Sequence, residues 1–194
     1  MAAARPGLHG AELARCLEPA AAALAADRDR LAQLQVDAVV GGFASYALGA
    51  VPAESLFESA LRNVRQLIAA MRAGRAPDRA DLDEGVRARQ RTGQGVPAAE
   101  LYDAYRMCLR LLAEEFRRTA TELELDHAAV LAGTRLLWDT ADVLTSVLVS
   151  ARHDVELELA RRDESHRGDL LRALIFDRPV PVEVRRRAAA FGLP

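Results

Sequence analysis

Apolar side chains recur with the 3.6-residue spacing of an α-helix along nearly the whole 194-residue sequence. The pattern is clearest after Pro97, where one helix face carries Leu101, Tyr105, Cys108, Leu109, Leu112, Phe116 and Ala120. No segment alternates apolar and polar residues in the way that a half-buried strand does. The periodicity therefore predicts an all-α fold, with residues 20–162 forming one helical domain.

Prolines and glycines predict the limits of the first helices. A helical segment over 11–17 is followed by Pro19, which suits the first turn of a new helix because no donor is needed there. That helix is expected to end near residue 42. A further helix is predicted over 53–73, where Gly74 ends it.

The second half of the sequence has similar signals. Asp78 is predicted to cap a short polar helix that ends near Gly93. Pro97 precedes the next helix, and Asp126 is the predicted cap of the last one. We expect this last helix over residues 127–162, much longer than the average of about 11 residues.

The last predicted helix begins apolar and becomes heavily charged. Five of its residues keep the spacing of a short parallel coiled coil, namely Leu144, Leu148, Ala151, Val155 and Leu159. We interpret this segment as a connector helix that pairs across a homodimer. The alternative is a simple solvated helix end.

The end of the sequence indicates a further domain. Residues 163–194 contain a short apolar helical segment, a break bracketed by two prolines and a basic helical segment before Gly192 and Pro194. Such a stop normally leads into another element. We therefore expect an N-terminal extension over 1–19 and the start of a following domain over 163–194, so that the chain is the N-terminal part of a longer protein.

The composition excludes several classes of protein. The net charge of −2 gives no reason to expect direct nucleic-acid binding, and all 26 basic residues are arginine, which we interpret as coding bias. Cys16 and Cys108 lie apart among apolar neighbours, which predicts free buried thiols. Neither a signal-peptide core nor an apolar run of about 18 residues occurs, so we expect a cytoplasmic protein without a membrane partner.

The sequence contains no recognisable catalytic or metal-binding motif. Its histidines, His9, His127, His153 and His166, have no partner four residues away and do not lie inside an apolar helix face, as a haem ligand would. GxSxG, P-loop, GxGxxG and DDxxD motifs are also lacking. We therefore expect no enzymatic activity, no metal and no cofactor.

A pocket between helices is the kind of binding site that this sequence allows. The candidate lining residues are Tyr102, Tyr105, Arg106 and Trp138. The alternative is ordinary packing together with a surface arginine. Tyr105 lies on the apolar stripe and is expected in the core under either interpretation.

Residues 86–112 resemble a known family. They contain an arginine-rich helix, a turn and a further helix, marked by Arg87, Arg89 and Arg91, then Gly95-Val96-Pro97, then Ala104-Tyr105-Arg106. This order resembles the N-terminal sensory domain of RsbR-type stress regulators, the RsbT co-antagonist domain. The resemblance implies a globin-like helical fold that binds no haem.

A second stretch indicates which kind of protein carries the domain. Residues 169–174 and 184–193 resemble the segment that opens the degenerate GGDEF-like domain of PucR/CdaR-type transcriptional regulators of actinobacteria. The resemblance implies a signal-input and dimerisation region that responds to an unknown small molecule or protein, with the DNA-binding domain outside this chain. The alternatives are an RsbR-like stressosome scaffold protein, which would continue into a STAS domain, and a globin-type ligand- or cofactor-binding protein.

Overall fold

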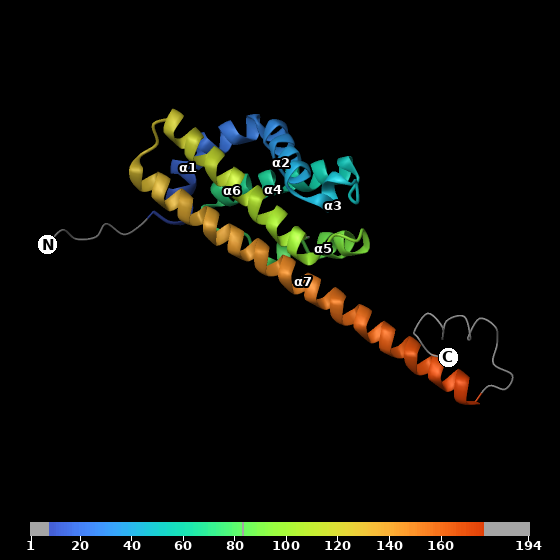
Figure 1. Cartoon of the computed structure of the whole chain (residues 1–194). Helices are drawn as coiled ribbons and strands as arrows, with labels where there is room; N and C mark the ends of the chain where they lie inside the picture. Colours follow the sequence, from blue (N-terminus) through green and yellow to red (C-terminus); the bar gives the residue numbers. More distant parts are fainter. Residues whose placement is uncertain (1–7, 83, 177–194) are drawn as a thin grey trace. The chain divides into compact units, whose positions relative to one another are not determined.

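The computed structural model describes residues 8–82 and 84–176, and every regular element in them is a helix (Figure 1). The helices are α1 (Gly10–Ala26), α2 (Arg28–Gly42), α3 (Ala44–Ala47), α4 (Ala53–Ala73), the 3-10 helix η1 (Arg79–Asp81), α5 (Glu84–Gly93), α6 (Ala98–Glu122) and α7 (His127–Phe176). No strand occurs in this part of the chain, so the all-α prediction is confirmed.

The structure divides into two units, of which the first ends at Arg152 and the second begins at His153. Helix α7 is continuous through this boundary. The first unit contains the packed core. In the second unit, residues 153–168 are exposed apart from half-buried Val155.

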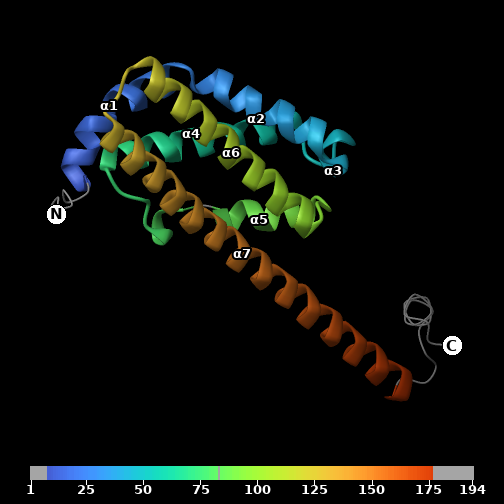
Figure 2. The ribbon, with the colours of Figure 1, turned by 60° about the vertical axis from the view of Figure 1, so that its left-hand side comes forward.

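Two apolar clusters fill the first unit. One joins α1, α2, α4, α6 and α7 around the fully buried Phe116, Leu17 and Met71. The other joins α2, α3, α4, α6 and α7, and it includes Val39, Leu101, Cys108, Leu148 and Ala151. Figures 1 and 2 both show α6 running alongside the first part of α7. Burial of these helix faces supplies most of the stability of the helices.

Helix α7 approaches its neighbours closely at Gly133. A Cβ atom added there would lie 2.5 Å from Cζ of Phe116 and 3.0 Å from Cδ2 of Leu17. A side chain at this position would therefore push α7 away from α1 and α6.

Most of the predicted helix limits agree with the structure. Helix α4 ends at Gly74, whose φ of 64° is left-handed and whose N–H bonds to the carbonyl of Met71. Helix α6 begins after Pro97, and the Asp126 carboxylate accepts a hydrogen bond of 3.1 Å from the N–H of Ala128 at the start of α7. Helix α7, however, continues past the predicted end near residue 162.

The predicted helix start at Pro19 is wrong. Pro19 lies inside α1, and the chain breaks eight residues later at Asp27. The side chain of Pro19 is exposed, whereas Leu17, Ala20 and Leu24 on the opposite face are buried in the first cluster. Packing of that face outweighs the local cost of proline in the helix.

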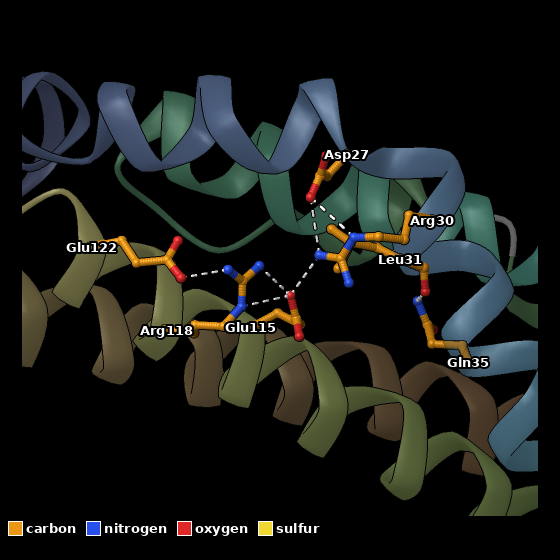
Figure 3. A network of polar contacts seen from close by, with 7 residues as sticks. All are labelled: Asp27, Arg30, Leu31, Gln35, Glu115, Arg118 and Glu122. Atoms are coloured by element: carbon orange, nitrogen blue, oxygen red, sulfur yellow. Dashed lines mark hydrogen bonds and ion pairs between the residues drawn. The ribbon is translucent and has the colours of Figure 1, made fainter.

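A polar network joins α2 to α6 on the surface (Figure 3). The carboxylate of Glu115 accepts hydrogen bonds of 2.8 Å from Arg30 on α2 and from Arg118 on its own helix. Arg118 also donates to Glu122. The hydrogen bonds from Arg118, together with the one from Arg30, hold the pKa of Glu115 below its ordinary value, against the opposing effect of partial burial.

Candidate functional site

A cavity of about 70 Å³ lies within the first unit, among α2, α3, α4, α5, α6 and α7. Most of its lining is apolar, with Leu56, Leu101, Cys108 and Leu148 among the contributing residues. The rest is polar and comes from Gln35, Ser59, Asn63 and Arg91, with the tyrosines Tyr46 and Tyr105. An apolar chamber with a few polar groups is typical of small-molecule sites.

Arg91 connects α5 to α4 at the polar side of the cavity. One terminal nitrogen, Nη1, donates to Oγ of Ser55 at 3.1 Å and to Oε1 of Gln94 at 2.8 Å. The other, Nη2, donates to the carbonyl of Ser55 at 3.0 Å and to Oγ of Ser59 at 2.9 Å. The side chain is 3% exposed, so these bonds replace the water that the cation loses.

Two buried amides form the neighbouring part of the polar side. Asn63 on α4 donates to Oε1 of Gln35 on α2 at 3.2 Å. Gln35 in turn donates to the carbonyl of Leu31 at 3.3 Å, as Figure 3 shows. Asn63 is 8% exposed and Gln35 is 1% exposed. The amide pair therefore joins α2 to α4 through a buried hydrogen bond.

Two titratable groups in the cavity wall are neutral near pH 7. Burial raises the pKa of the Cys108 thiol to about 12. Burial also raises the pKa of the Tyr46 hydroxyl to about 12. Neither group supplies the low-pKa nucleophile that covalent catalysis uses.

The four predicted pocket residues do not gather in one place. Tyr105 lines the cavity, and half-buried Tyr102 packs against the second apolar cluster. Arg106 is exposed and lies 3.9 Å from the carboxylate of Asp103. Trp138 is 61% exposed on α7 and is not part of the cavity wall.

The predicted coiled-coil seam is wrong in its first three residues. Leu144, Leu148 and Ala151 are buried within the chain itself, so they leave no surface for a second copy. Val155 is half-buried and Leu159 is 51% exposed, both in the second unit. The large exposed apolar residues of α7 in the first unit lie elsewhere, at Leu131, Trp138 and Val149.

A hydrogen bond links the last residue of the first unit to α5. Nη1 of Arg152 on α7 donates to Oγ1 of Thr92 at 2.7 Å, and it lies 3.4 Å from the carbonyl of Val96. Thr92 directly follows Arg91, the residue that joins α5 to the cavity wall. Helix α5 therefore contacts both the cavity and the point where α7 passes into the second unit.

Sequence reasoning missed the polar side of the cavity. In the sequence, Arg91 stands out only as part of an arginine-rich motif, and no motif marks Gln35. One signal could have identified Asn63, because this single asparagine of the chain stands within the apolar pattern of the 53–73 helix. A polar residue in such a position needs a buried partner or a ligand.

Two kinds of site are absent from the residues that the structure describes. In the described part of the chain, no three histidine, cysteine or acidic residues are grouped as a metal ion would need. No helix within the same residues is both long and apolar enough to cross a bilayer.

Comparison with known proteins gives one informative result. No curated protein and no solved structure is significantly similar to the chain. Residues 29–167, however, match the family described as the RsbT co-antagonist protein rsbRD N-terminal domain. The matched region includes the whole lining of the cavity and most of α7. The chain therefore belongs to the family of RsbT co-antagonist N-terminal domains.

Proposed function

We propose that this chain is the non-catalytic signal-input and dimerisation domain of a regulatory protein, and that α7 passes the signal to an output domain. The observation that carries the proposal is the course of α7. This helix lines the cavity through Leu148, bonds to α5 through Arg152 and continues to Phe176. A change in the cavity can therefore bias the position of a helix that leaves the domain.

The output that we favour is transcription control. The similarity of residues 169–174 and 184–193 to the start of a GGDEF-like domain supports a PucR-type regulator. In such a protein, this chain would contact DNA only through a domain outside it. The family match equally favours a second candidate, an RsbR-like scaffold of a stressosome. The residues that follow this chain in the longer protein separate the two, because a STAS domain belongs to the scaffold.

The dimer is proposed to form through the exposed side of α7. Leu131, Trp138 and Val149 are separated by 7 and 11 residues, which places them within about 20° on a helical wheel. We call these three residues the outer stripe. Arg135 and Asp142 lie along one edge of the stripe, and no ion pair of either is found among the described residues. In an antiparallel pair of α7 helices, Arg135 of one copy would face Asp142 of the other twice.

Insertions into α7 test the transmission. Two residues inserted near Glu158, in the longer protein with its output domain, rotate everything downstream by about 200°. Seven inserted residues add about two whole turns and nearly restore the original direction. We expect the first insertion to abolish regulation of the output and the second to preserve most of it. Equal regulation in both insertion variants and the wild type would make α7 a passive tether.

A further inference from the structure

The amide of Asn63 keeps hydrogen-bonding capacity that the protein does not use. An asparagine side chain has two N–H donors and a carbonyl that accepts twice. In the described chain, its only hydrogen bond is the one that it donates to Gln35. The second N–H and the Oδ1 atom of Asn63 have no protein partner, although the residue is more than nine-tenths buried in the cavity wall. Such a group needs water or a ligand.

Gln35 adds a second donor next to Asn63. Its Nε2 donates to the carbonyl of Leu31, and its Oε1 accepts from Asn63, which leaves one N–H unused. The two amides together therefore present both donors and an acceptor to the cavity. A hydroxyl or a primary amide, which donates and accepts at one place, matches this set.

The occupied state of Arg91 argues for a neutral ligand. Each of its four terminal N–H groups meets one of four acceptors, supplied by Ser55, Ser59 and Gln94. None of these four is left for a ligand carboxylate. An anion would also have to face the carbonyl oxygen of Asn63 and lose its hydration, which is costly in a buried site.

Most of the remaining lining selects an apolar body of small size, although Tyr46, Ser59 and Tyr105 also belong to the wall. Leu56, Leu101, Cys108 and Leu148 offer no strong hydrogen bond, and an ordered water needs two to four polar partners. The cavity of about 70 Å³ is roughly half the size of a cavity of about 150 Å³ that accommodates benzene. It therefore fits a molecule of about three to five non-hydrogen atoms.

We propose that this cavity is a binding site for a short-chain neutral molecule with one hydroxyl or amide group. The polar group bonds to Asn63 and Gln35, and the alkyl part contacts Leu101, Cys108 and Leu148. The claim that this ligand is the signal of the domain rests on the function proposed above. The claim that the cavity binds it does not.

Asn63 gives a direct measurement, because it is the single asparagine of the chain. Selective ¹⁵N-asparagine labelling yields one side-chain amide pair in the NMR spectrum of the whole chain. We expect n-propanol and propionamide to shift these signals with saturation at about millimolar concentrations. Propionate at pH 7 should leave them in place.

Variants identify the site and its polar group. Ala104 lines the cavity, so Ala104→Val should abolish the saturable shift. Ala120, which is buried on the same helix but outside the cavity, provides the matched control Ala120→Val, with affinity unchanged within about twofold. Asn63→Leu should weaken n-propanol binding about tenfold, measured by calorimetry. If Asn63→Leu does not fold, the wild-type titration and the Ala104→Val and Ala120→Val variants still show whether the ligand binds in this cavity.

Three results would overturn the inference. The first is a linear, unsaturable shift with n-propanol and propionamide, which would mean that the cavity holds water alone. The second is an equal or larger saturable shift with propionate. The third is saturable binding that survives Ala104→Val. These binding results are independent of the insertion test. Failed binding with a positive insertion result would remove the ligand class and leave the transmitting role of α7 intact.

Discussion

Arg152 donates a 2.7 Å hydrogen bond from its guanidinium to the hydroxyl of Thr92. It thereby joins the end of the first unit to a helix that also forms part of the cavity wall. Because the donor is charged, this bond is stronger than one between neutral groups.

A double-mutant cycle measures this contact. We expect Arg152→Ala and Thr92→Val together to destabilise the chain by about 1–2 kcal/mol less than the sum of the single variants, because the shared hydrogen bond is lost only once. Urea unfolding followed by circular dichroism supplies the four free energies. Strict additivity would show that the bond contributes nothing to stability.

The outer stripe predicts a dimer that a single charge can disrupt. Trp138 and Leu131 are 61% and 59% exposed, so Trp138→Asp or Leu131→Asp should preserve the fold and yield monomers in light scattering. Leu48 is more exposed still and lies outside α7, so Leu48→Asp is the matched control and should remain dimeric. A monomeric wild type at high concentration would contradict the proposal.

The close packing at Gly133 predicts that even a methyl side chain there lowers the stability of the fold. Gly133→Ala should destabilise the chain by about 1–3 kcal/mol, because the added methyl overlaps the buried ring of Phe116. Nothing lies within 4 Å of the same methyl at Gly41 in α2. Gly41→Ala should therefore leave stability unchanged or raise it by up to about 1 kcal/mol. Thermal unfolding of both variants provides the comparison.

The two thiols should react at very different rates. The raised pKa of Cys108, about 12, leaves roughly one thiol in ten thousand ionised at pH 8, and the side chain is buried. Half-buried Cys16 is more accessible. Reaction with a disulfide reagent should show a fast and a slow phase. Cys16→Ser should retain only the slow phase and Cys108→Ala only the fast one.

Glu115 predicts a dependence of stability on pH. Its pKa is lowered in the folded state, so it contributes stability above its unfolded pKa of about 4.5, and this contribution is lost as the pH falls through the folded value. Glu115→Gln should cost about 1 kcal/mol at pH 7. The difference from wild type should shrink at acid pH below about 4.5, measured by urea unfolding across the range.

The helix content could be predicted because it depends on local pattern. Gly74 and Pro97 mark helix ends through backbone geometry that few residues share, and both predictions agree with the structure. At Pro19, long-range packing outweighed the local rule. Periodicity alone reveals which face of a helix is apolar but not what covers it. For that reason the pattern places Leu144 and Leu148 at an interface with a partner chain, whereas they are buried in the core of their own domain.

The cavity could not be predicted for a related reason. Its polar side combines Gln35, Asn63 and Arg91 from three helices, and no short motif records their proximity. Tyr105 lies against the second apolar cluster, as the periodicity predicts, whereas only residue type links it with Arg106 and Trp138. Residue type alone, without distances, points to Trp138 and Arg106, both of which are exposed.

The close contact at Gly133 fixes α7 at one point, about which the helix can tilt. With no side chain between this position and Phe116, sliding α7 along its axis would drive the neighbouring side chains into that ring, so the helix has a fixed fulcrum. Arg152 lies 19 residues further along, about 28 Å at 1.5 Å per residue. A tilt of only about 2° at the fulcrum moves Arg152 by about 1 Å, enough to break or form its bond to Thr92.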